Sequence, residues 1–248
     1  MSDPLASPRL PPVVILAGGF GTRVRHLLPD VPKPMAPVRG RPFIEWVVRY
    51  FAKKGCADFT LSTGYLAEVI ARHFETQPVP NVRVTCRPET TPLGTAGGFL
   101  NCLPPLLPPR STLLVVNGDS LVFADPRPLI APLAAGRADA AVLGLALDDA
   151  ARYGTLEVDA SGRLIAFREK RPGAGLINSG VYAFTGAVIR AMPVVRPLSF
   201  ETEVFPVLAG KGRVEVVRTA APFLDIGTPA SLAEAEVFIA GNQHEFLP

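Results

Sequence analysis

The segment Val13–Ala17 is an unbroken apolar run, and the glycine cluster Gly-Gly-Phe-Gly at 18–21 follows it directly. Such a run is typical of a strand buried on both faces, as in a parallel sheet that helices cover above and below. Ligands of these sheets bind at the carboxyl ends of the strands. The feature therefore predicts an α/β fold with a binding loop immediately after its first strand.

Strand and helix patterns alternate along the first half of the chain. Pro42 suits the first position of a helix, and Gly55 suits the position just past its end. The patterns predict strands over 57–62, 82–86 and 113–117 and helices over 42–54, 66–74 and 94–103. This alternation is typical of a Rossmann-like, doubly wound α/β fold.

The second half reads differently, because short strands are joined by turns such as the hairpin signal at 159–162. Strands are predicted over 138–146, 154–158, 164–169, 179–184 and 213–218, and helices over 199–209 and 229–240. We expect antiparallel strands added to the parallel sheet. No hexapeptide repeat follows, so no C-terminal β-helix is expected. Residues 1–12 are expected to be a flexible leader without a signal peptide, and 13–248 a single domain.

Composition narrows the classes of function. Hydrophobic residues make up 48% and charged residues 19%, which indicates a globular core rather than disorder. A net charge of +3 without a Lys/Arg run argues against a nucleic-acid partner, and no apolar run spans a bilayer. The three cysteines and three histidines are scattered, which argues against disulfides and zinc. Together these features predict a cytoplasmic protein, and a homo-oligomer is compatible with them.

The glycine cluster and the residues after it are suited to phosphate. Glycines let the backbone approach a ligand and turn N–H groups onto phosphate oxygens, and Arg23 adds a planar fork of donors. Lys33 lies between Pro32 and Pro34, which restrict where its ammonium group can go. The string is neither a Walker A loop nor G-x-G-x-x-G. The alternative interpretation is a tight structural turn followed by a solvated lysine.

The string L-A-G-G-F-G-T-R at 16–23, followed by P-K-P-M at 32–35, resembles the sugar-phosphate nucleotidyltransferases, or NDP-sugar pyrophosphorylases. The segment P-L-G-T-A-G-G at 92–98 resembles the base-binding segment of that family, and the resemblance spans about residues 13–240. It implies that about 13–135 bind the nucleotide and 136–248 the sugar phosphate. The implied nucleotide-binding residues are Leu16, Ala17, Gly18, Gly19, Gly21, Thr22, Glu89, Pro92, Gly94 and Thr95.

Glu89 is the position that bears on the base. An ionised carboxylate only accepts hydrogen bonds. Guanine offers two adjacent donors, N1–H and the exocyclic amine, whereas thymine and uracil offer one donor beside acceptors. The residue therefore favours GTP, although Glu89 could instead cap the following helix or face solvent.

Two aspartates lie in motifs that the resemblance assigns to a metal, Asp119 in Asn-Gly-Asp and Asp225 in Asp-Ile-Gly-Thr-Pro. Two carboxylates can hold Mg²⁺ against phosphate oxygens. The resemblance further implies that Arg23, Lys33, Asp119 and Lys170 are catalytic, with Lys170 holding the attacking phosphate. The implied sugar-phosphate-binding residues are Tyr153, Gly154, Glu169, Lys170, Asn178 and Glu201.

The reaction so implied joins an NTP and a sugar 1-phosphate to give an NDP-sugar and pyrophosphate. The motifs are most similar to D-glycero-D-manno-heptose 1-phosphate guanylyltransferases, which serve capsule or lipopolysaccharide synthesis. Mannose 1-phosphate guanylyltransferases and glucose 1-phosphate thymidylyl- or uridylyltransferases remain alternatives. A different class is a non-catalytic sugar-nucleotide-binding regulatory subunit, which loss of Arg23, Lys33 or an aspartate would favour. A glycosyltransferase would typically carry Asp-x-Asp where this chain has Asn117-Gly118-Asp119.

Overall fold

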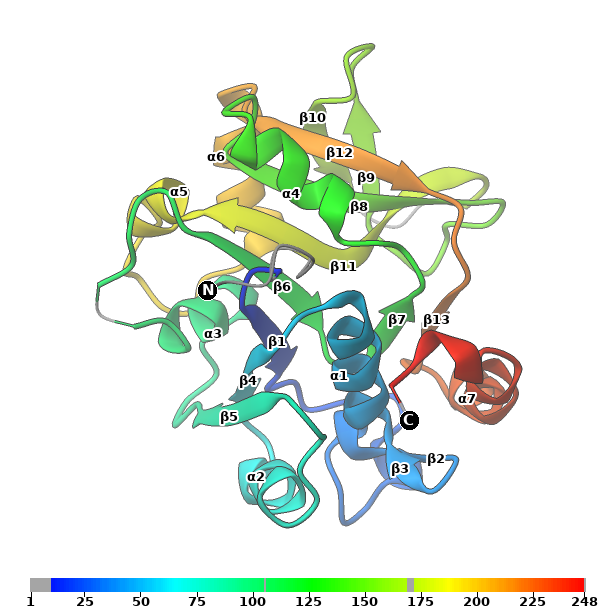
Figure 1. Cartoon of the computed structure of the whole chain (residues 1–248). Coiled ribbons are helices and arrows are strands. Elements are labelled where there is room, and N and C mark those ends of the chain that lie inside the picture. Colours follow the sequence, from blue (N-terminus) through cyan, green and yellow to red (C-terminus); the bar gives the residue numbers. More distant parts are fainter. Residues whose placement is uncertain (1–9, 105, 169–171, 248) are drawn as a thin grey trace, which may run out of the picture.

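The computed structural model describes residues 10–104, 106–168 and 172–247. A nine-stranded mixed sheet lies at the centre of this part of the chain, in the order β10-β9-β11-β6-β1-β4-β5, with β8 and β12 joined through β11 (Figure 1). The strands are β1 (Val13–Ala17), β4 (Asp58–Thr63), β5 (Arg83–Pro88), β6 (Thr112–Asn117), β8 (Ala140–Leu147), β9 (Thr155–Val158), β10 (Leu164–Arg168), β11 (Gly175–Thr185) and β12 (Val214–Thr219).

Helices cover both faces of the sheet. Val13 and Ile15 of β1 pack into a core shared with α1 and α7, whereas Val14 packs into a second core shared with α3 and α6. Figure 1 shows α1 and α4 in front of the sheet. The α-helices are α1 (Phe43–Lys54), α2 (Ala67–Thr76), α3 (Thr95–Asn101), α4 (Arg127–Ala134), α5 (Gly186–Arg190), α6 (Phe205–Gly210) and α7 (Pro229–Gly241). The predicted doubly wound, mixed α/β class is confirmed.

Strand direction differs from the expectation at one place. β11 pairs antiparallel with both β6 and β8, and β9 and β10 form an antiparallel pair, as predicted. β12, however, runs parallel to β8, with Val214 opposite Ala140. A parallel partner needs a long connection, and residues 148–213, which contain β9, β10, β11, α5 and α6, supply one between β8 and β12.

Several element ends also differ from the prediction. α1 begins at Phe43, because Pro42 is extended (φ −61°, ψ 144°) and pairs with Pro37 in the small ribbon of β2 (Pro37–Val38) and β3 (Arg41–Pro42). Gly55 ends the helix at φ 110°, as expected. The predicted helix 199–209 is a π-helix, η3 (Phe200–Val204), followed by α6.

Two very short strands escaped prediction and matter for the site. β7 (Ser120–Val122) pairs antiparallel with β13 (Phe223–Asp225). The remaining short elements are the 3-10 turns η1 (Arg25–Leu27), η2 (Lys33–Met35) and η4 (Gln243–Glu245). Since the last described elements are α7 and η4, the described residues contain no C-terminal β-helix. Within the same ranges, every helix lacks the length or the apolar character that a membrane span requires.

Candidate active site

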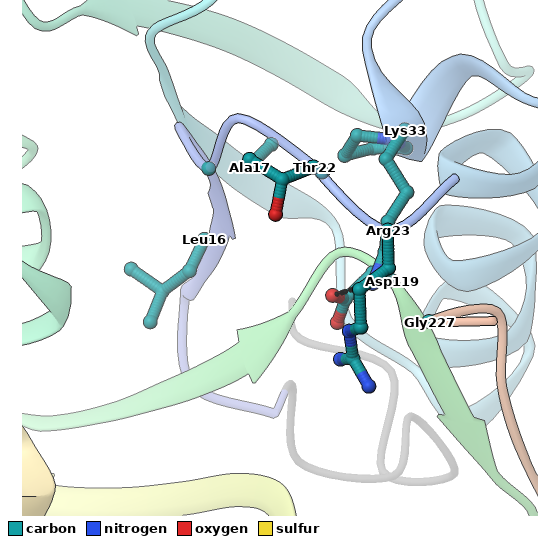
Figure 2. A pocket seen from close by; sticks show the side chains of 10 residues that line it. Leu16, Ala17, Thr22, Arg23, Lys33, Asp119 and Gly227 are labelled. Carbon is teal, nitrogen blue, oxygen red and sulfur yellow. Dashed lines mark ion pairs between the residues drawn. The ribbon is translucent and has the colours of Figure 1, made fainter. Parts of the chain in front are cut away.

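The glycine loop after β1 forms one wall of a cavity of about 230 Å³ at the carboxyl end of the strand (Figure 2). Basic, acidic and backbone groups from four separate segments meet there. The lining residues are Leu16, Ala17, Gly19, Gly21, Thr22, Arg23, Lys33, Pro34, Asp119 and Gly227. The loop, the P-K-P-M turn and both aspartate motifs, which are far apart in the sequence, therefore share one space.

Lys33 points across this cavity to Asp119, and its Nζ lies 2.6 Å from Asp119 Oδ2 (Figure 2). The lysine side chain is only 10% exposed, so its ammonium group is held in place rather than solvated. Gly21 makes this approach feasible: its φ is +59°, and a Cβ there would lie 2.7 Å from Lys33 Cβ. The glycine loop therefore leaves the space that the Lys33 side chain needs.

The ribbon of β7 and β13 brings the two aspartates together. Asp225 lies opposite Ser120 in the ribbon, and Ile226 N donates to Asp119 O at 3.0 Å. Burial raises the pKa of Asp225, and the nearby negative charge of Asp119 raises it further. Arg152 Nη2 lies 3.3 Å from Asp225 Oδ1 and partly balances this charge.

The aspartate pair has the donor chemistry of a magnesium site that depends on substrate. Mg²⁺ is bound through one or two carboxylates together with waters and substrate phosphates. Among the described residues there is no cluster of three or more His, Cys, Asp or Glu side chains around one point. Two carboxylates beside a cavity lined by an arginine, a lysine and glycine backbone groups have donor chemistry that fits such a cation.

A second cavity, of about 330 Å³, adjoins the first. It shares Leu16, Gly19 and Asp119 with the first cavity and extends along the segment before α3. We call the first cavity, which Arg23 and Lys33 line, the phosphate-side cavity, and the second, which Glu89 lines, the base-side cavity. Its lining residues are Leu16, Gly18, Gly19, Phe20, Glu89, Pro92, Gly94, Thr95, Asn117 and Asp119. All ten residues predicted to bind nucleotide therefore line one cavity or the other.

Glu89 enters the second cavity with its carboxylate fixed by the protein. Ser62 Oγ donates to Glu89 Oε1 at 2.7 Å, and Leu93 N donates to Oε2 at 3.1 Å. Each carboxylate oxygen can accept a second hydrogen bond. The carboxylate is thus oriented, half-buried and still able to accept from a ligand.

The residues predicted for the sugar phosphate form two small groups beside these cavities. Asn178 Nδ2 donates to Tyr182 OH at 2.7 Å, and Tyr182 OH donates to Glu201 Oε1 at 3.4 Å. Gly154 lies next to this group, because its carbonyl oxygen accepts from Asn178 N at 3.0 Å. Glu169 and Lys170 lie outside the described residues.

Tyr153 belongs to the other group, close to the aspartates. Its ring packs edge-on against Phe223 with 5.7 Å between centroids. Burial raises the pKa of Tyr153, and the charge of Asp225 adds to this effect. Tyr153, a residue predicted to bind the sugar phosphate, therefore lies close to β13 and to Asp225, one of the two candidate metal ligands.

The structure adds contacts at three residues that were not assigned individually from the sequence, although Arg152 lies in the predicted segment Arg152-Tyr153-Gly154. Arg152 pairs with Asp225, Asn117 lines the second cavity, and Phe20 lines it with 52% of its surface exposed. Phe20 lies in the glycine loop itself, so an aromatic residue among glycines was the available signal for an exposed ring at this site. No sequence signal links Arg152 to Asp225, because the pair forms only when β13 docks on β7.

The sequence is similar to a known protein family and to several named enzymes. Residues 12–242 match the family described as Nucleotidyl transferase. The chain is 34% identical over 233 residues to a mannose-1-phosphate guanylyltransferase of Mycobacterium tuberculosis, covering 92% of this chain but only 63% of that protein. It is 30% identical over 224 residues to a D-glycero-alpha-D-manno-heptose 1-phosphate guanylyltransferase of Aneurinibacillus thermoaerophilus, covering 90% and 96% of the two chains.

A solved structure gives the same picture for the fold. The crystal structure of HddC from Yersinia pseudotuberculosis complexed with GMP-PN superposes with a TM-score of 0.82 at 32% identity. The superposition covers 93% of this chain and 100% of the HddC chain. A putative glucose-1-phosphate thymidylyltransferase from Bacillus anthracis, at 23% identity and a TM-score of 0.77, has the same fold.

Proposed function

This chain belongs to the nucleotidyl transferase family, and we propose that it transfers GMP from GTP to a sugar 1-phosphate, preferably a heptose 1-phosphate. The products are the GDP-sugar and pyrophosphate. The observation that carries the proposal is the adjoining pair of cavities, one lined by Arg23, Lys33 and Asp119 and the other by an oriented Glu89. A charged triphosphate fits the first cavity, and a guanine base fits the second.

The chemistry needs positioning and charge neutralisation rather than a general base. An oxygen of the sugar 1-phosphate attacks the α-phosphorus, and pyrophosphate leaves. A phosphate monoester has a second pKa of about 6, so the attacking oxygen is largely ionised at neutral pH. Arg23 and Lys33 bind the leaving phosphates, where negative charge builds up, and their fixed placement lowers the barrier. Lys33, paired with Asp119 in this structure, gains a second anionic partner when the triphosphate enters.

We also propose Mg²⁺ as the cofactor, held by Asp119 and Asp225. The paired carboxylates and the adjoining phosphate-side cavity support this assignment. A bound cation supplies charge neutralisation and orientation for the phosphates. The protein's own contribution is to hold both carboxylates on one ribbon.

Guanine is favoured by the donor pattern around Glu89. Ser62 and Leu93 already fix its carboxylate, which leaves one acceptor position on each oxygen. Those two positions match the adjacent N1–H and amine donors of guanine. The mannose and heptose relatives named above are both guanylyltransferases, which agrees with this preference.

Heptose 1-phosphate is the preferred acceptor in this proposal, and mannose 1-phosphate is the second candidate. The heptose relative matches over 96% of its length, whereas the mannose relative is somewhat more identical but matches over 63% of its length. On the sugar side we assign Tyr153, Gly154, Asn178 and Glu201, together with Lys170 for the attacking phosphate. A GDP-heptose product would serve surface polysaccharide synthesis from the cytoplasm.

The deciding experiment measures pyrophosphate release with Mg²⁺, each of the four NTPs and heptose, mannose or glucose 1-phosphate. We expect the highest kcat/KM with GTP and heptose 1-phosphate and no release without a divalent cation. Preference for mannose 1-phosphate would transfer the assignment to the second candidate. Nucleotide binding without pyrophosphate release in any combination would instead identify a regulatory subunit.

A further inference from the structure

The hydroxyl group of Thr95 joins the wall of the base-side cavity to a carboxylate on the sugar side. Thr95 Oγ1 donates to Glu201 Oε2 at 2.9 Å and accepts from Phe200 N at 2.9 Å. Thr95 is the first residue of α3, and Glu201 lies in the π-helix η3, more than a hundred residues later in the chain. A single side chain therefore bridges two segments that sequence analysis assigned to different substrates.

The backbones of the same two segments are also bonded to each other. Leu198 N donates to Leu93 O at 2.8 Å, and Leu198 O accepts from Ala96 N at 3.0 Å and Gly97 N at 3.1 Å. Gly94 has a φ of +77°, and any Cβ there would collide with the carbonyl group of Leu198. The segment 93–97 and the segment 198–201 are consequently held together as one block, with Thr95 as its side-chain connection.

The Glu201 carboxylate is oriented by this block and keeps capacity for a ligand. Its Oε2 accepts from Thr95 and from Ser199 Oγ at 3.0 Å, and its Oε1 accepts from Tyr182 OH at 3.4 Å. A carboxylate has about four acceptor positions, so one position on Oε1 is open. Glu201 is half-buried, whereas Tyr182 behind it is fully buried. The open position therefore belongs to a half-buried carboxylate that the protein otherwise holds in place.

We propose that Thr95 is a positioning residue for the acceptor substrate: it holds Glu201 ready for a sugar hydroxyl and couples that site to the base-side cavity. The proposal rests on the function proposed above. A nucleotide that packs against 92–95 restricts the remaining motion of the shared block, so the sugar 1-phosphate then binds to a Glu201 that moves less. By linkage, the two substrates raise each other's affinity by the same factor. A π-helix at this point agrees with a functional role, since such turns are frequent at functional sites.

The test compares Thr95→Val, which keeps the shape and removes the hydroxyl, with Thr95→Ser, which keeps the hydroxyl. Thr202→Val is the matched control, because Thr202 is exposed on the same π-helix and its hydroxyl makes no hydrogen bond among the described residues. We expect Thr95→Val to raise the KM for the sugar 1-phosphate about tenfold, the scale of one hydrogen bond to a charged group. Any rise in the Kd for GTP measured alone should be smaller than this, because the Thr95 hydroxyl is engaged with Glu201 and Phe200. Thr95→Ser and Thr202→Val should resemble the unmodified protein.

Coupling is measured directly by titrating the sugar 1-phosphate with and without a GTP analogue whose α–β bridge cannot be cleaved. The analogue should increase sugar 1-phosphate affinity in the unmodified protein, and Thr95→Val should remove most of that increase. In a double-mutant cycle with Glu201→Gln, adding Thr95→Val should raise the sugar 1-phosphate KM much less than it does in the otherwise unmodified protein. The reason is that the two side chains act through one contact.

Two failures are distinguishable. An unmodified protein that releases no pyrophosphate from any substrate pair overturns the proposed function, and this inference falls with it. An active protein in which Thr95→Val leaves the sugar 1-phosphate KM unchanged, or raises the Kd for GTP measured alone as much as the sugar 1-phosphate KM, overturns the inference alone. Failure of Thr95→Ser to restore the KM would likewise show that the hydroxyl is not responsible.

Discussion

At the residue scale, each aspartate of the candidate pair is matched by a basic side chain. Asp119 pairs with Lys33 at 2.6 Å, and Asp225 pairs with Arg152 at 3.3 Å. Arg23, which lines the phosphate-side cavity, has no such partner among the described residues. Arg23 is therefore the basic group of this cavity that can bind an added anion without first giving up an acidic partner.

Arg23→Ala should lower kcat by about a hundredfold or more, which is the typical cost of removing one fixed donor from a charged transition state. Because Arg23 is exposed, the melting temperature should change little. Pyrophosphate release under saturating GTP and sugar 1-phosphate measures the effect. Arg72→Ala, which removes an exposed arginine on α2, is the control, and near-normal turnover in Arg23→Ala would contradict the assigned role.

Glu89→Gln tests how the base is read. An amide offers one acceptor where the carboxylate offers two, so the variant should lose about tenfold in kcat/KM for GTP. ITP lacks the exocyclic amine, and its kcat/KM should fall less. The ratio of GTP to ITP is therefore the measurement. An unchanged ratio would mean that Glu89 serves the fold through Ser62 and Leu93 and does not contact the amine.

At the element scale, local patterns predicted most of the fold and much of the candidate site. The run Val13–Ala17 and its glycine loop identified the first strand and the family resemblance, which the comparisons confirm. By contrast, β7 and β13 are three residues each, too short to show a period, and lie about a hundred residues apart. Their pairing, and with it the contact of Arg152 with Asp225, depends on tertiary packing that no local pattern encodes.

The loop before α3 also depends on a contact that no local pattern encodes, the close approach of Gly94 to Leu198. The backbone of Gly94, at φ +77° and ψ 168°, lies in a region that is essentially restricted to glycine. Gly94→Ala should destabilise the protein by about 1–3 kcal/mol from backbone strain alone, with more from the collision at Leu198. Chemical denaturation measures the change.

Gly210→Ala is the matched control for this substitution, because nothing lies within 4 Å of a Cβ at that position and its φ is not positive. It should be neutral or slightly stabilising. Equal stability of both variants would contradict the conformational argument. The KM for the sugar 1-phosphate should rise in Gly94→Ala only, since the block that holds Glu201 depends on this loop.

At the scale of the whole molecule, a buried ionic network ties distant elements together. Glu45 of α1 is 1% exposed and accepts from Arg49 at 2.7 Å, and it lies 2.7 Å from His73 of α2. Arg49 in turn donates to Leu247 O at 3.3 Å. The network therefore joins two helices to the end of the described chain, remote from the candidate site.

Glu45 should make stability depend on acid pH. Burial raises its pKa, but hydrogen bonds from Arg49 and His73 outweigh burial and lower the pKa below the ordinary 4.5. A carboxyl with a lowered folded-state pKa stabilises the fold above its unfolded pKa, and this contribution is lost as the pH falls through the lowered value. Glu45→Gln should cost about 3 kcal/mol at pH 7 and flatten the stability profile below pH 4.5.

Urea unfolding between pH 3 and 7 measures this dependence. Glu68→Gln, at an exposed position of α2, is the control and should leave the profile unchanged. A Glu45→Gln profile that runs parallel to that of the unmodified protein would show that other carboxyl groups dominate acid unfolding.

Ligand binding should stabilise the molecule as a whole, because the candidate site is assembled from segments of both halves of the chain. A ligand present at a hundred times its Kd adds about 2.7 kcal/mol to the free energy of unfolding. For a chain of 248 residues this corresponds to a rise of about 5–10 °C in melting temperature. GTP with Mg²⁺ should produce such a shift, while ATP at the same concentration should produce less, because adenine presents no adjacent pair of donors to Glu89.

Sugar 1-phosphate alone should raise the melting temperature little, yet it should raise it by several degrees when a non-cleavable GTP analogue is also bound. Independent, additive shifts from the two ligands would mean that the base-side cavity and Glu201 respond separately, despite the hydrogen bonds that join them.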